Sequence, residues 1–82
     1  LSKSLQYFYL EDYFLALNEV EEVIVRFPML AIAYARKGTI YYQMGDFQNA
    51  TLNWNLALKH DPEYTEVQNM LLNIKTAIEN NN

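Results

Sequence analysis

The sequence predicts an all-α fold of stacked helical hairpins, with about five helices and a capping helix at the C-terminal end. Three observations lead to this prediction. Residues 34–62 contain two runs of apolar side chains at helical spacing, which indicates two helices with one buried face each. Gly45 and Asp46 lie between the runs, where a glycine lets the chain reverse and a carboxylate can cap the second helix. The same features recur 34 residues apart along the chain.

Residues 1–30 are expected to contain an incomplete copy of this hairpin. Residues 1–10 are interpreted as the remainder of a first helix, and Asp12 is the expected N-cap of the next one. That helix should end before Pro28, since the residue preceding a proline avoids helical geometry. Its expected buried stripe is Tyr13, Ala16, Leu17, Val20, Val23, Ile24 and Phe27. The acidic residues that point away from the stripe, interpreted as a solvated face, are Glu19, Glu21 and Glu22.

A closing helix is expected from Glu63 to about Glu79, with Pro62 at its first position. Its apolar stripe is Val67, Met70, Leu71, Ile74 and Ile78. Because the opposite face is polar, this helix should cover the last hairpin with one side and meet solvent with the other. Leu72 stands where a repeat would carry a small residue, which favours a cap over a third full repeat. The asparagines at 80–82 are expected to form a disordered tail.

The period of 34 residues is marked by identical residues in both copies. The identical pairs are Tyr7 and Tyr41, Asp12 and Asp46, Ala16 and Ala50, and Pro28 and Pro62. The corresponding aromatic pairs are Phe8 and Tyr42, and Tyr13 and Phe47. This period and pattern resemble the tetratricopeptide repeat. In the second copy the resemblance is carried by Gly38, Tyr41, Ala50, Trp54, Ala57 and Pro62.

The resemblance implies a single domain over residues 1–82. Its parts would be a truncated first repeat (1–30), a second repeat (31–64), a capping helix (65–79) and the tail (80–82). The sequence departs from the family at Lys37, where leucine is usual, and at Val20 and Val23, where the family has an aromatic residue and an alanine. If the 34-residue register of the second repeat is extended toward the N-terminus, the first four positions of the first repeat fall before Leu1. The fragment is therefore expected to begin inside a repeat.

Composition and charge argue against several functional classes. The 82 residues carry a net charge of −4 with a pI near 4.7, which argues against binding to nucleic acid or to an anionic membrane surface. No apolar run approaches the ~20 residues that a membrane-spanning helix requires. The chain has no cysteine, so disulfides and thiolate chemistry are excluded. No signal peptide is visible. The sequence does not decide the compartment; the cytoplasm is slightly favoured and the periplasm is the alternative.

The sequence contains no recognisable catalytic or metal-binding constellation. His60 is the one histidine and lies at an expected helix end, where a structural role beside the last carbonyl groups is usual. Gly38 and Gly45 do not form a phosphate-binding loop, and the carboxylates fall at caps and on exposed faces. We therefore predict that the protein is not an enzyme and requires no metal ion or cofactor.

The resemblance implies a concave surface lined by the first helix of each hairpin. The predicted partner-binding residues on this surface are Leu5, Phe8, Tyr9, Arg36, Thr39, Tyr42, Gln43, Asn69 and Asn73. The resemblance also places on this side Ile32, Ala35, Glu66 and Met70. Met70 and Phe8 could equally belong to the core. Some family members hold a peptide carboxylate in a two-lysine clamp, and a single Arg36 beside Glu66 does not fit that chemistry.

Two functions remain open. The first is a protein-interaction module that binds a peptide or segment of another protein in the groove. The second is a structural unit within a larger array that self-associates, for instance as a homodimer, and binds no peptide ligand. A second candidate surface, apolar at outward positions, consists of Phe14, Leu15, Leu52 and Leu56. The alternative for this surface is a slightly rotated packing that buries it.

Overall fold

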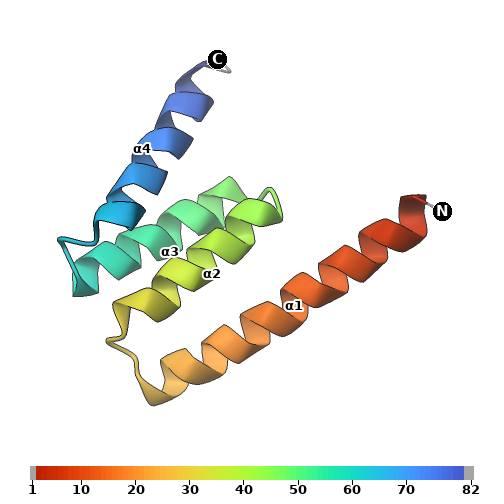
Figure 1. Cartoon of the computed structure of the whole chain (residues 1–82), viewed down its shortest axis with the longest axis horizontal. Coiled ribbons are helices and arrows are strands. Elements are labelled where there is room, and N and C mark those ends of the chain that lie inside the picture. The colour runs from red at the N-terminus through yellow and green to blue at the C-terminus, as the bar shows by residue number, and fades with distance from the viewer. Residues whose placement is uncertain (1, 81–82) are drawn as a thin grey trace.

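The computed structural model describes residues 2–80, with side chains described for residues 12–77, 79 and 80. It contains four helices (Figure 1): α1 Ser2–Arg26, α2 Ala31–Gln43, α3 Phe47–His60 and α4 Thr65–Asn80. No strand occurs in the described range, so the predicted all-α class is confirmed. α2 and α3 form an antiparallel hairpin, and α1 and α4 lie on opposite sides of it in Figure 1.

The reversal between α2 and α3 follows the predicted chemistry. Gly45 has a φ of 83°, a left-handed conformation that a side chain would strain. Its N–H donates to the Tyr42 carbonyl at 3.0 Å, and the Asp46 N–H donates to the Tyr41 carbonyl at 2.9 Å. These two bonds close the end of α2 in the Schellman arrangement. The Asp46 carboxylate then caps α3, accepting from the backbone N–H of Asn49 at 3.2 Å.

Trp54 on α3 forms the centre of the core. Its indole is 1% exposed and donates from Nε1 to the Ala35 carbonyl of α2 at 3.2 Å. Gly38 faces the same ring, and a Cβ placed there would lie 2.4 Å from Trp54 Cδ1. Ala50 and Ala57 are fully buried, so the predicted small positions do allow α2 and α3 to approach closely.

The prediction of a helix break at Asp12 is wrong. α1 runs without interruption from residue 2 to 26, so the chain has four helices instead of about five. Asp12 matches Asp46 in the 34-residue register, but the residue before it is Glu11, where the later copy has Gly45. Without a glycine to adopt positive φ, the chain cannot make the same reversal cheaply, and α1 continues as one helix.

Both proline turns have the same structure. Pro28 and Pro62 each occupy the second position of a four-residue turn, closed by hydrogen bonds of 3.1 Å from Leu30 to Phe27 and from Tyr64 to Asp61. Each proline carbonyl also accepts at 2.7 Å from the side chain six residues later, Tyr34 Oη after Pro28 and Gln68 Nε2 after Pro62. The period of 34 is therefore visible in the hydrogen bonds as well as in the sequence.

The Pro62 turn excludes a start of the closing helix at Pro62 or Glu63, whereas the predicted start at residue 65 agrees with the structure. Pro62 is a turn residue, not the first helical residue, and α4 begins at Thr65. The Asp61 carboxylate accepts from the Glu63 N–H at 3.3 Å, which holds Glu63 in the turn. At the other end, Asn80 is the last residue of α4, contrary to the predicted tail, and residues 81–82 lie outside the described range.

α4 and α1 contribute unequally to the core. Val67 and Ile74 of α4 are buried in one cluster with Trp54 and Ala57, as expected of a helix that covers the hairpin. The side chain of Ile78 lies outside the described set. From the predicted stripe of α1, Leu17 is buried, but Val23 and Phe27 are exposed, which contradicts their assignment to the core.

Candidate functional site

A groove of about 830 Å³ is lined mainly by residues of α1, α2 and α4. α2 contributes more lining residues than any other helix, α1 and α4 contribute from either side, and Trp54 of α3 lies at its base. The lining residues are Ala16, Glu19, Val20, Ile32, Ala35, Arg36, Thr39, Ile40, Trp54, Tyr64, Glu66, Val67, Asn69 and Met70. The lining is mainly apolar with a few charged and amide groups, a composition typical of binding grooves.

The base of the groove is held by one hydrogen bond from α3 to α2 and by one within α2. The Ala35 carbonyl accepts from Trp54 Nε1 at 3.2 Å and from the Thr39 hydroxyl at 3.0 Å. Trp54 also packs against Tyr42, with ring centroids 5.7 Å apart. The base is thus fixed before any ligand arrives, which lowers the entropic cost of binding.

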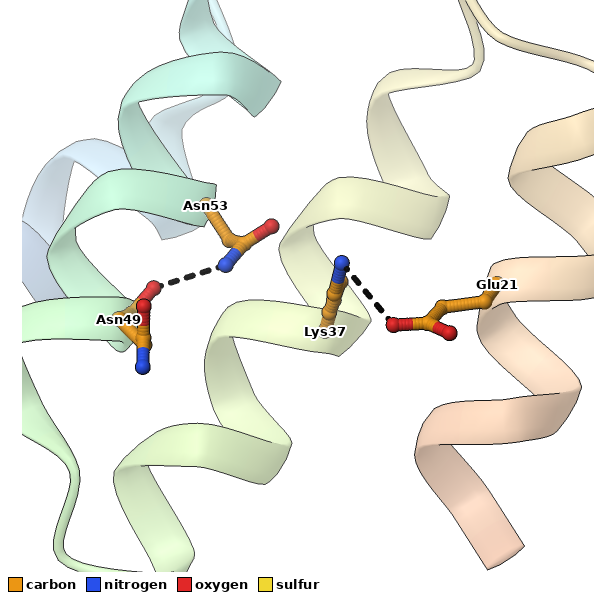
Figure 2. Close-up of polar contacts among 4 residues, drawn as sticks. All are labelled: Glu21, Lys37, Asn49 and Asn53. Carbon is orange, nitrogen blue, oxygen red and sulfur yellow. Dashed lines mark hydrogen bonds and ion pairs between the residues drawn. The ribbon is translucent and has the colours of Figure 1, made fainter. Parts of the chain in front are cut away.

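The side of the groove formed by α1 is fastened to α2 by an ion pair. Lys37 Nζ lies 3.4 Å from Glu21 Oε1, and Figure 2 shows the two side chains bridging the helices. This accounts for a lysine at a position where leucine was expected. Glu21 is exposed, as predicted, and in addition pairs with Lys37. Asn53, the buried polar residue of α3, satisfies its amide locally by donating to the Asn49 carbonyl at 2.8 Å (Figure 2).

Residues 31–64 match the family model of the tetratricopeptide repeat, and this range comprises α2, α3 and the turns that end them. Residues 31–64 form a tetratricopeptide repeat. Proteins of this family generally mediate protein–protein interaction and are typically non-enzymatic. Neither the curated proteins nor the solved structures include a match to the chain.

The structure brings together only some of the predicted groove residues. Arg36 and Thr39 of the tetratricopeptide repeat and Asn69 of α4 line one groove, together with Ile32, Ala35, Glu66 and Met70, which the resemblance had placed on the same side. Gln43 and Asn73 are exposed but are not lining residues of this groove. The predicted groove residues whose side chains lie outside the described set are Leu5, Phe8 and Tyr9.

Tyr42 has a packing role that the sequence did not indicate. Its ring lies 5.3 Å from that of Phe47 and 5.7 Å from that of Trp54, measured between centroids. It therefore braces the tetratricopeptide hairpin near its turn, although 41% of the residue remains exposed. Replacing Tyr42 would disturb packing as well as surface, so Tyr42 is a poor probe of binding.

Sequence reasoning placed Leu5, Phe8 and Tyr9 in the groove but missed two other residues of α1. Glu19 and Val20 line the groove, although Glu19 had been assigned to solvent and Val20 to the core. A smaller adjoining pocket of about 250 Å³ shares four residues with the groove, Glu19, Val20, Ile32 and Arg36. The positions of these residues in the sequence do not indicate that they share a pocket, because their proximity depends on how α1 crosses α2.

The second candidate surface is only partly exposed. Phe14 and Leu15 of α1 and Leu52 of α3 are each more than half exposed, whereas Leu56 is half-buried. A further apolar patch, which the sequence had not indicated, surrounds the α1–α2 turn. This corner patch consists of Val23, Val25, Phe27, Met29, Leu30 and Ile32.

His60 stacks on Tyr34 with ring centroids 5.2 Å apart, which links the end of α3 to the start of α2. Within the described part of the chain, no group of three or more histidine or acidic side chains could hold a metal ion. No helix in that part is both long and apolar enough to cross a membrane.

Proposed function

We propose that this protein binds a segment of a partner protein in the groove between α1, α2 and α4. The observation that carries the proposal is an open, mainly apolar groove over a base that hydrogen bonds already hold in place. Ile32 is 45% exposed and borders both the groove and the adjoining pocket, so its side chain offers apolar area to a ligand. The family's general role in protein–protein interaction supports the same function.

The test uses a library of random 12-residue peptides displayed on phage and selected on the immobilised chain. Affinities of selected peptides are then measured by fluorescence anisotropy. Ile32→Glu should abolish binding, because it places a charge against the apolar part of the groove. Leu52→Glu is the matched control, since Leu52 is 57% exposed on α3 and does not line the groove.

Both variants should retain the thermal stability of the parent, because both positions are exposed. Equal affinity of the two variants would show that the peptide binds elsewhere, and the proposed groove would then be wrong. Selection of no peptide by the parent chain would also count against the proposal.

Self-association is a second candidate function. It is supported by the exposed residues Phe14, Leu15 and Leu52 and by the corner patch around the α1–α2 turn. Exposed apolar side chains that gather on a surface mark interaction sites in other proteins. A copy of the chain could cover such a surface as a symmetric dimer, with the groove left unoccupied.

A further inference from the structure

We infer that the groove selects a partner segment in which a lysine or arginine lies next to apolar side chains. This inference rests on the proposed function and adds the chemistry of the partner. The inference follows from the charged side chains that line the groove and from the helix that carries each of them.

Two carboxylates enter the groove from opposite sides of the hairpin. Glu19 belongs to α1 and Glu66 to α4, both are exposed, and both line the groove. Among the described side chains, the one ion pair within 4.0 Å joins Lys37 to Glu21. Neither Glu19 nor Glu66 therefore has a cation of the described set at contact distance. A cationic side chain of a bound segment could pair with either carboxylate.

Arg36 is the single cation of the lining and does not balance the two acids. Groove residues thus sum to a net charge of −1, on a chain whose net charge is −4. The local field favours the approach of a cation and opposes an acidic segment. The Arg36 guanidinium can still donate to main-chain carbonyl oxygens of the bound segment, which requires no acid in the partner.

The apolar part of the groove restricts the partner further. Val20, Ile32 and Met70 line the same groove as the charged groups, so a segment that is only polar would leave this apolar surface uncovered. Burial of apolar side chains supplies affinity, while the charges of the groove select among apolar segments. The favoured partner is therefore an amphipathic protein segment of positive charge.

The experiment starts from the phage-selected peptides described above. Peptides selected on the parent chain should be enriched in lysine or arginine adjacent to leucine, isoleucine or phenylalanine. For one such peptide, the double variant Glu19→Gln/Glu66→Gln should bind roughly five-fold more weakly, as expected when the peptide's cation loses an exposed ion pair with either carboxylate. Raising the salt concentration should weaken the parent complex more than the variant complex.

The matched control is the double variant Glu22→Gln/Glu63→Gln. It changes the net charge of the chain equally, but both residues are exposed outside the groove lining, so affinity should change less than two-fold. Selected peptides without a cation, or equal affinities of the two double variants, would overturn the inference while Ile32→Glu still abolishes binding. Binding that is insensitive to Ile32→Glu would instead overturn the proposed function.

Discussion

The indole of Trp54 connects three helices. It belongs to α3, hydrogen-bonds to the Ala35 carbonyl of α2, and shares a buried cluster with Val67 of α4. Its buried N–H is satisfied by that carbonyl, so the ring cannot rotate away without leaving a donor unpaired. Gly38 faces this fixed ring at a point where a Cβ would have no room.

We predict that Gly38→Ala destabilises the protein. The added Cβ would lie 2.4 Å from Trp54 Cδ1 and 2.5 Å from Nε1, so the helices must separate. Overpacking of this kind costs about 1–3 kcal/mol. The better helix propensity of alanine would return only about 1 kcal/mol. Urea unfolding followed by circular dichroism measures the difference. Gln43→Ala, exposed on the same helix, is the control and should change stability little. A Gly38→Ala protein at least as stable as the parent would contradict the close contact.

At the scale of elements, helix ends decide how this chain is divided. α3 begins where Asp46 caps it, immediately after a glycine with positive φ. Asp12 occupies the same register position in the first copy, yet lies within α1. Two aspartates that the sequence makes equivalent therefore have different structural roles.

This difference can be measured with two matched substitutions. Asp46→Ala removes the acceptor for the Asn49 N–H and should cost about 1 kcal/mol of the free energy of unfolding. Asp12→Ala removes no cap and replaces an exposed residue inside a helix, so stability should be unchanged or rise by up to about 0.7 kcal/mol. Chemical denaturation of both variants is the measurement. A similar loss at both sites would mean that a helix begins at Asp12 in solution and that α1 is divided.

α4 stabilises the protein through one face only. Ile74 is 4% exposed in the cluster around Trp54, whereas Leu72, two residues earlier, is 62% exposed. Ile74→Ala should lower the free energy of unfolding by about 2–5 kcal/mol, since it removes buried carbon and leaves a cavity. Leu72→Ala should change it by less than about 0.5 kcal/mol. Thermal and urea unfolding distinguish the two, and equal effects would show that α4 is rotated relative to the structure.

At the scale of the whole molecule, apolar area remains exposed on more than one side. The corner patch lies at the α1–α2 turn, Phe14 and Leu15 on α1, and Leu52 on α3. These surfaces lie apart from the buried cluster that holds α2, α3 and α4 together. A small helical array gains stability when a neighbour covers such surfaces.

We therefore expect the isolated chain to dimerise at high concentration. Sedimentation velocity from micromolar to millimolar concentration should show a shift from monomer to dimer. Phe27→Glu at the corner patch and Leu52→Glu on α3 identify the surface, because each places a charge on one apolar region. If Phe27→Glu alone restores the monomer, the corner patch is the interface. A parent chain that stays monomeric at millimolar concentration would contradict self-association.

Local signals in the sequence determined the hairpin of residues 31–64. Gly45, Asp46 and the apolar spacing around Trp54 each specify a conformation through their own backbone or through neighbours within four residues. The core positions Ala50 and Ala57 and the all-α class were predictable for the same reason. The sequence also predicted that Arg36 and Thr39 point to the same side of the hairpin, because they share one face of α2.

Tertiary structure decided what periodicity could not. Asp12 and Asp46 occupy the same position of the 34-residue period, which predicts a reversal of the chain at each of them. A reversal depends, however, on a glycine before the aspartate, and only the second copy has one. Glu19 and Val20 became groove residues, and Phe27 an exposed one, through the way in which the continuous α1 lies against α2. A repeat in the sequence specifies which residues share a helix face, whereas the neighbour that covers this face depends on contacts between residues far apart in the chain.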